Sequence, residues 1–106
     1  MRQLMPSELA TFLRTSPEPP LLLDVREPWE FSICQFDNAQ LVPMRQIPDL
    51  LPTLDPDRPV VVICHHGIRS QQVARYLEHH GLRQVINLRG GIDAWAREVD
   101  FSMPTY

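Results

Sequence analysis

Residues 60–70 read VVVICHHGIRS and combine the end of one element with the start of another. Four branched apolar residues, Val60–Ile63, predict a short buried strand that ends at Cys64. A helical pattern opens at Ser70, because apolar residues recur beyond it at helical spacing. Cys64 is therefore expected on a short loop between the carboxyl end of a strand and the amino end of a helix.

This position favours the ionised form of Cys64. Loop amides and the dipole of the following helix attract an anion, and Arg69 adds a full positive charge. Gly67 permits the positive φ angle that turns successive amides inward. The pattern predicts a nucleophilic cysteine in an anion-binding loop. The alternative is a cysteine that only closes a buried strand as a small apolar side chain.

The composition restricts the classes of function. The chain has 106 residues, of which 43% are hydrophobic, and this suits one domain over residues 1–106 with a carboxyl-terminal tail at 99–106. A net charge of −3 argues against a general nucleic-acid or anionic-membrane binder. No apolar run approaches membrane-spanning length, and the first residues lack the pattern of a secretory signal. Two cysteines form no disulfide framework, so we expect a reducing, cytoplasmic location.

Strand and helix signals alternate along the chain. Helical patterns cover residues 5–13, the short stretch that opens at Pro28, and the proline-containing segment 47–54, whereas residues 21–25, 41–42 and 85–88 read as strands. Such alternation predicts an α/β fold with a mostly parallel central sheet of about five strands and helices on both faces. The loops after the carboxyl ends of the strands then form the functional edge of the sheet.

Two charged residues, Asp24 and Arg26, lie at the carboxyl end of the strand predicted at residues 21–25 and are therefore expected at this edge. Asp24 comes after three leucines, so it needs a partner, and we expect it to cap nearby amides or to pair with an arginine. Direct catalysis by Asp24 is disfavoured, because a carboxylate beside Cys64 would oppose ionisation of the thiol. Arg26 is a candidate for holding an anionic donor. Cys34 is expected in a packing position away from the edge.

His65 and His66 directly follow Cys64. Adjacent residues on a tight loop rarely point at one ion, and no second metal-binding motif accompanies them, so we expect no metal site. We expect the two imidazoles to shape the mouth of the pocket, where one of them can pass a proton or meet an anionic donor.

Three motifs resemble those of the rhodanese-like sulfurtransferases. Residues 64–70, Cys-x-x-Gly-x-Arg-Ser after a valine-rich strand, resemble the active-site loop of that family. Residues 24–27, Asp-Val-Arg-Glu, resemble its first strand-end motif, and residues 87–95, Asn-Leu-Arg-Gly-Gly-Ile-Asp-Ala-Trp, resemble its closing strand, glycine pair and last helix. Residues 97–106 are also similar to tails on rhodanese domains that are fused to adenylyltransferases. Residues 34–39 depart from the family, which usually has a Gly-His-Ile-Pro-Gly-Ala-like run there.

The resemblance implies a rhodanese-like fold and a sulfurtransferase that needs no cofactor. Cys64 would attack the outer sulfur of thiosulfate or of a protein persulfide and would carry it as a persulfide. Cyanide, a thiol or a protein would then accept the sulfur. The residues that would bind and stabilise the anionic sulfur are those of the loop, namely His65, His66, Gly67, Ile68, Arg69 and Ser70.

Two other functions remain open. A phosphatase or arsenate reductase on this fold also uses a loop from Cys to Arg, but those relatives have five intervening residues and this chain has four. The shorter ring suits a single sulfur atom better than a tetrahedral oxyanion. A non-enzymatic interaction module is the second alternative, although such domains have commonly lost the cysteine that is present here.

Overall fold

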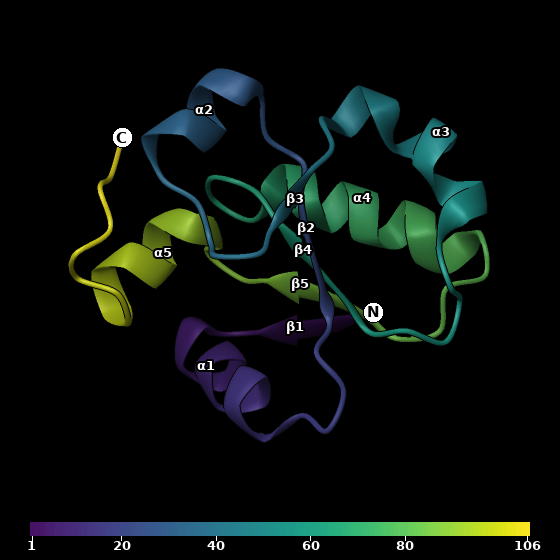
Figure 1. The fold of residues 1–106 in the computed structure, drawn as a ribbon, viewed down its shortest axis with the longest axis horizontal. Helices are drawn as coiled ribbons and strands as arrows, with labels where there is room; N and C mark the ends of the chain where they lie inside the picture. Colours follow the sequence, from purple (N-terminus) through teal and green to yellow (C-terminus); the bar gives the residue numbers. More distant parts are fainter.

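Five strands form one sheet in the computed structural model, which describes residues 1–106 (Figure 1). The strands are β1 (Arg2–Leu4), β2 (Leu21–Asp24), β3 (Gln40–Leu41), β4 (Val60–Ile63) and β5 (Val85–Leu88). They lie in the order β1-β5-β4-β2-β3, and every neighbouring pair is parallel. The predicted α/β fold with a five-stranded parallel sheet is confirmed.

Helices cover both faces of this sheet. They are α1 (Pro6–Thr15), α2 (Pro28–Ile33), α3 (Ile47–Leu50), α4 (Ile68–His79) and α5 (Gly91–Glu98), and the 3₁₀ turns Met44–Gln46 and Leu51–Thr53 flank α3. A proline opens α1 and another opens α2, where a missing backbone N–H costs nothing. None of these helices combines the length and the apolar character that a membrane crossing requires.

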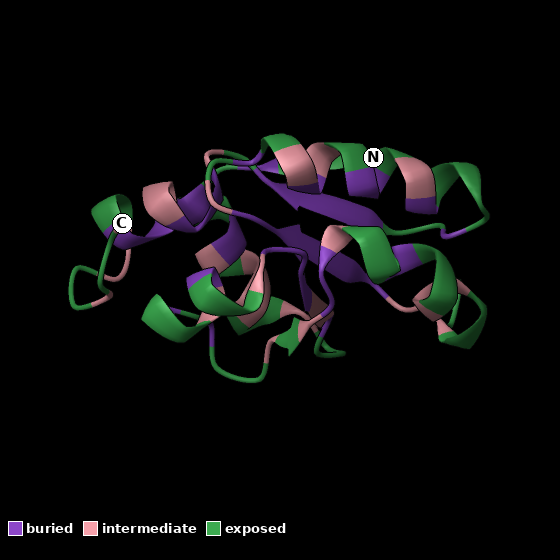
Figure 2. Ribbon diagram, turned by 90° about the horizontal axis from the view of Figure 1, so that it is seen from above, coloured by how far each residue is buried: buried purple, intermediate pink, exposed green.

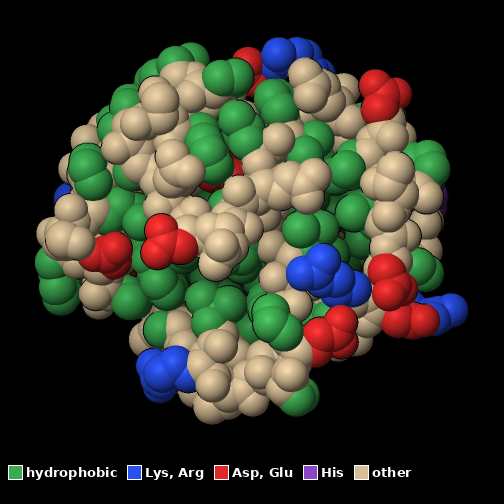
Figure 3. Space-filling view, in the orientation of Figure 1, with side chains coloured by type: hydrophobic (Ala, Val, Ile, Leu, Met, Phe, Trp, Pro, Cys, Tyr) green, Lys and Arg blue, Asp and Glu red, His purple; other side chains and the backbone are tan.

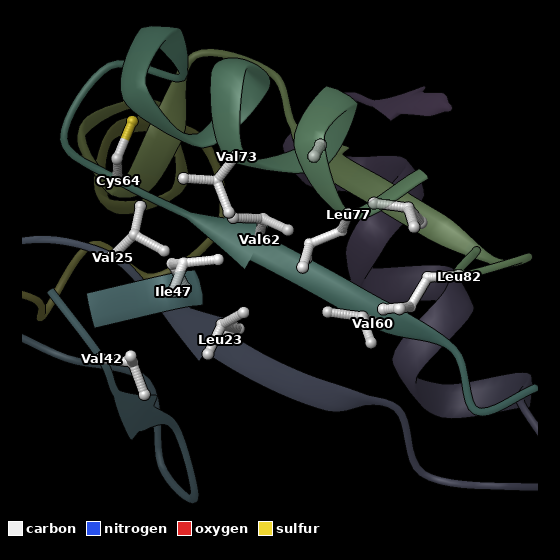
Figure 4. Close-up of a cluster of buried hydrophobic side chains, with 12 residues drawn as sticks. Leu23, Val25, Val42, Ile47, Val60, Val62, Cys64, Val73, Leu77 and Leu82 are labelled. Atoms are coloured by element: carbon white, nitrogen blue, oxygen red, sulfur yellow. The ribbon is translucent and has the colours of Figure 1, made fainter. Parts of the chain in front are cut away.

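The central strand β4 supplies side chains to two separate cores. Val60 and Val62 join the cluster under α3 and α4, whereas Val61 and Ile63 join the cluster under α1 and α5. This alternation follows from the two-residue period of a strand. Figure 2 shows the buried strands enclosed between helices, and Figure 4 shows the first of the two clusters. A strand that is buried on both faces explains the uninterrupted apolar run in the sequence.

The order of the strands places a switch in direction next to Cys64. From β2 the chain passes through α2 to β3 on one side, and from β4 it passes through α4 to β5 on the other side. The loops after β2 and β4 therefore lie side by side at the carboxyl edge and leave in opposite directions. In open α/β sheets a crevice for ligands forms at such a point.

The two edge strands are the shortest of the sheet. β1 has three residues and β3 has two, against four in each inner strand. β1 was not among the strands predicted from the sequence, because Arg2 and Gln3 are polar and exposed and only Leu4 is buried. Its pairing with β5 completes the sheet.

Charged side chains of both signs are interspersed on the face of the molecule that Figure 3 shows, with apolar side chains between them. The mixed surface agrees with the net charge of −3.

Candidate active site

Cys64 is the first residue after β4, and its sulfur accepts two backbone hydrogen bonds. The N–H groups of Gly67 and Ser70 lie 3.1 Å and 3.3 Å from Sγ. The residue is only 1% exposed, and its sulfur points toward the first turns of α4 (Figure 4). The sulfur therefore lies in the positive field at the amino end of a twelve-residue helix.

Gly67 directs the chain from the cysteine into α4. It has a φ of 92°, and a Cβ atom at this position would lie 3.0 Å from the backbone nitrogen of Gly90. α4 consequently begins at Ile68, two residues before the predicted start at Ser70. The earlier start brings the Ser70 amide into the first turn, from which it reaches back to the sulfur.

The amino end of α5 holds the opposite side of the loop. Ile92 donates its N–H to the carbonyl of Cys64 at 2.9 Å, and Asp93 donates to the carbonyl of His65 at 3.1 Å. Gly91 makes this approach possible, because a Cβ atom there would lie 2.6 Å from the carbonyl oxygen of Cys64 and would overlap the carbonyl of His65. The loop therefore presents its carbonyl groups to α5 and its sulfur to α4.

A buried polar network lies beside the sulfur. Ser70 Oγ is 3.2 Å from Sγ and donates to Asn87 Oδ1 at 2.5 Å. The amide nitrogen of Asn87 donates to the carbonyl of Gly67 at 3.2 Å and to Gln3 Oε1 at 2.8 Å. Asn87 was not predicted as a site residue. The available signal was one amide side chain inside the otherwise apolar strand β5.

Arg69 pairs with Glu30 of α2. Its two terminal nitrogens each lie 2.8 Å from a different carboxylate oxygen, and the Glu30 side chain is only 5% exposed. These hydrogen bonds lower the pKa of Glu30 to about 2, against the opposing effect of burial. The hydrogen bonds to Glu30 in turn raise the pKa of Arg69. The positive charge expected at the cysteine is present, but a carboxylate that the sequence analysis did not identify compensates it.

Asp24 and Arg26 form a completely buried ion pair of 2.8 Å. Asp24 also accepts the backbone N–H of Arg26 at 3.1 Å, so it makes both kinds of contact that were expected of it. The guanidinium of Arg26 donates further to the carbonyls of Glu30 and Cys34, at 3.3 Å and 2.7 Å. Arg26 has no exposed surface, so the structure places it as a brace for α2 and not as a contact for a donor in solution.

Tyr106 brings the carboxyl-terminal tail to the site. Its ring stacks on the ring of His65, with centroids 3.8 Å apart and planes 8° from parallel. Its hydroxyl donates to Glu30 at 2.8 Å and accepts from Arg26 at 3.0 Å. Burial raises the pKa of Tyr106 to about 12. The tail was predicted only as an extension of the domain, and no local pattern indicated that it would contact the site.

His65 and His66 form the rim of the site, where His65 is half-buried and His66 is exposed. Their ring centroids are 3.8 Å apart, and the His66 side chain is 61% exposed. Burial, and then the charge of His66, lower the pKa of His65. Contrary to the expectation that adjacent histidines point apart, their ligand atoms and those of Asp93 lie within 4.8 Å of one another. Asp93 is already paired with Arg97 at 2.9 Å, and a cation in that position opposes a metal ion.

The comparison with protein families agrees with this geometry. Residues 5–98 match the family model described as the rhodanese-like domain. The chain belongs to the rhodanese-like family.

Rhodanese-like relatives include proteins of different sizes. The chain is 42% identical over 89 residues to the rhodanese-like/PpiC domain-containing protein 12, chloroplastic, of Arabidopsis thaliana, with 80% of this chain and 30% of that protein covered. It is 36% identical over 76 residues to the thiosulfate sulfurtransferase GlpE of Vibrio cholerae, with 72% of each covered. The crystal structure of a rhodanese-like domain protein from Staphylococcus aureus superimposes with a TM-score of 0.83 at 33% identity, over 93% of this chain and 95% of that one.

The predicted loop residues have different positions in this rhodanese-like domain. Gly67 and Ser70 contact the sulfur, His65 and Arg69 border the site, and Ile68 is 70% exposed and contacts solvent. Cys34 lies in the core cluster under α1 and α5, whereas Cys64 belongs to the cluster on the other face of the sheet. Both cysteines are free.

Proposed function

We propose that this rhodanese-like domain is a sulfurtransferase in which Cys64 carries the transferred sulfur as a persulfide. The observation that carries the proposal is the environment of Sγ, which accepts two amide hydrogen bonds at the amino end of α4 while the residue is 1% exposed. Fixed N–H donors in a site with little water stabilise a sulfur anion strongly. The name of the Vibrio cholerae relative, a thiosulfate sulfurtransferase, supports thiosulfate as a donor.

The reaction proceeds in two displacements. The Cys64 thiolate attacks the outer sulfur of thiosulfate, so a bond forms between the two sulfur atoms. The sulfur–sulfur bond of thiosulfate breaks, and sulfite leaves with its electron pair. Cyanide, a thiol or a protein nucleophile then attacks the outer sulfur of the persulfide, and Cys64 leaves as a thiolate. A persulfide on another protein serves as donor in the same way. Neither displacement needs a cofactor, because the leaving group carries away the electron pair in each step.

The rim of the site supports a small anionic donor or a protein persulfide. Arg69 is partly exposed, with 36% of its side chain accessible, and the His66 side chain is 61% exposed. Both groups are able to meet an anion that approaches the cysteine, whereas the deeply placed sulfur itself accepts only a narrow group. We propose a reducing, cytoplasmic setting, because the chemistry requires a free thiol at Cys64.

Intact-mass measurement tests the persulfide directly. After incubation with thiosulfate, the wild type should gain the mass of one sulfur atom, and cyanide should remove that mass and release thiocyanate. Cys64→Ser should show neither change, whereas Cys34→Ser should gain the sulfur like the wild type, since Cys34 lies on the other face of the sheet. Equal labelling of a folded Cys64→Ser protein would refute the assignment of the nucleophile. Absence of labelling from thiosulfate and from a protein persulfide would refute the persulfide itself.

A further inference from the structure

The orientation of the Asn87 side chain is determined by its neighbours. The carbonyl oxygen of Gly67 lies 3.2 Å away and is able only to accept, so it requires the amide nitrogen of Asn87. Reversing the amide would bring two oxygens together at that position. The carbonyl oxygen Oδ1 of Asn87 is thereby directed at Ser70, whose hydroxyl oxygen lies 2.5 Å from it.

This orientation determines the direction of the Ser70 hydroxyl. Ser70 has one hydroxyl hydrogen, and Asn87 Oδ1 accepts it. The lone pairs of Ser70 Oγ then face Cys64 Sγ at 3.2 Å. In this arrangement the hydroxyl accepts a hydrogen from a neutral thiol, and it has none to donate to a thiolate.

We infer that Asn87 is a positioning residue that holds the Ser70 hydrogen away from Cys64 and so favours the neutral thiol in the resting protein. The inference rests on the proposed function, in which Cys64 is the nucleophile. The two amides of Gly67 and Ser70 favour the thiolate, and the hydroxyl opposes them.

Ionisation of Cys64 has a cost in this network. If Ser70 turns its hydrogen to the sulfur, Asn87 Oδ1 loses its donor while Asn87 is only 1% exposed. If Ser70 does not turn, its lone pairs face a negative sulfur. An unsatisfied buried acceptor is unfavourable by about 1–3 kcal/mol, so either route favours the thiol. The thiolate is the species that oxidants attack, so a larger fraction of neutral thiol slows the oxidation of Cys64.

A titration of the single remaining thiol tests this inference. In a Cys34→Ser background, the ultraviolet absorbance of the thiolate is followed against pH, with Cys34→Ser/Cys64→Ser as the baseline. Asn87→Ala releases the Ser70 hydroxyl to donate to sulfur, so the midpoint should move down by about one pH unit, which is about tenfold more thiolate below the midpoint. In a Ser70→Ala background, Asn87→Ala should leave the midpoint where Ser70→Ala alone has it, because the effect of Asn87 acts through the hydroxyl.

If Asn87→Ala changed the midpoint only by loosening the loop, the change would persist in the Ser70→Ala background. The double variant therefore separates positioning of the hydroxyl from a general structural effect. An unchanged midpoint in a folded Asn87→Ala protein would overturn the inference. If Asn87→Ala does not fold, Ser70→Ala alone decides. We expect its midpoint to fall, because the hydroxyl that opposes the thiolate is gone. An unchanged midpoint would overturn the inference, and a rise of about one unit would show in addition that the hydroxyl already donates to the thiolate. The titration uses no sulfur donor, so a failure to form the persulfide would refute the proposed function without affecting this result.

Discussion

Arg69 and Glu30 are joined by two hydrogen bonds of 2.8 Å that connect the first turn of α4 to α2. Glu30 also accepts the backbone N–H of Glu27 at 3.0 Å, so the same carboxylate caps α2 and neutralises the arginine beside Cys64. The charge that a donor meets at this site is therefore set by the pair. Glu30 is the residue through which that charge is most directly changed.

Removing the charge of Glu30 should improve the binding of anionic donors. In Glu30→Gln the amide oxygen still accepts from one Arg69 nitrogen and from the Glu27 N–H, whereas the NH2 group cannot accept from the other Arg69 nitrogen, and the arginine is no longer neutralised. We expect the KM for thiosulfate to fall about threefold at low salt, which matches the modest energy of a partly exposed charge, and the effect to shrink at high salt. Glu27→Gln is the matched control, because its exposed partner Arg45 lies outside the site. An unchanged KM at low ionic strength would show that Arg69 does not meet the donor.

The same residue should make stability depend on pH. The pKa of Glu30 lies at about 2 in the folded chain, below its ordinary value of 4.5. Ionised Glu30 therefore stabilises the fold above about pH 4.5, and this contribution is lost as the pH falls toward 2. In urea unfolding, Glu30→Gln should be less stable than the wild type at pH 7 by on the order of 1–3 kcal/mol, and the difference should shrink at pH 3. A difference that is equal at both pH values would contradict the shift.

A methyl group at Gly91 should displace the active-site loop. Its Cβ would overlap the backbone of Cys64 and His65, and the φ of 67° is unfavourable for alanine. We expect Gly91→Ala to lose most sulfur-transfer activity and to lower the melting temperature. Gly81→Ala is the control, since it has a φ of 103° with nothing within 4 Å of the added atom. That variant should lose only about 1–2 kcal/mol of stability and keep its activity. Equal losses of activity in both variants would mean that the contact with the loop is unimportant.

The phosphatase alternative predicts a different substrate. Four residues separate Cys64 from Arg69, and the amides of only two residues, Gly67 and Ser70, bond to the sulfur. We expect the wild type to turn over thiosulfate and to leave an aryl phosphate unhydrolysed, because the ring of donors does not surround three phosphoryl oxygens at normal hydrogen-bond length. Release of the phenol is followed by absorbance, with Cys64→Ser as the blank. Rapid hydrolysis by the wild type that is lost in Cys64→Ser would replace the sulfurtransferase proposal.

The parts of this fold that the sequence predicted are those with a strong local pattern. Val60–Ile63 read as a buried strand because β4 is covered on both faces, and the placement of Cys64 followed from it. β1 gave no such signal, since two of its three residues are polar and its pairing with β5 spans most of the chain. Glu30 and Tyr106 were also missed. Glu30 contacts Arg69, which lies 39 positions later, and Tyr106 contacts His65, which lies 41 positions earlier. Spacing patterns in a sequence predict only contacts within one helix, strand or turn.

The short edge strands have a consequence for how this protein meets others. β1 and β3 together leave only five residues of edge backbone, so a second chain finds little template on which to extend the sheet. Edge-to-edge aggregation is disfavoured at high protein concentration. If the proposed sulfur transfer involves a protein donor or acceptor, we expect that protein to contact side chains at the carboxyl edge and not to extend the sheet.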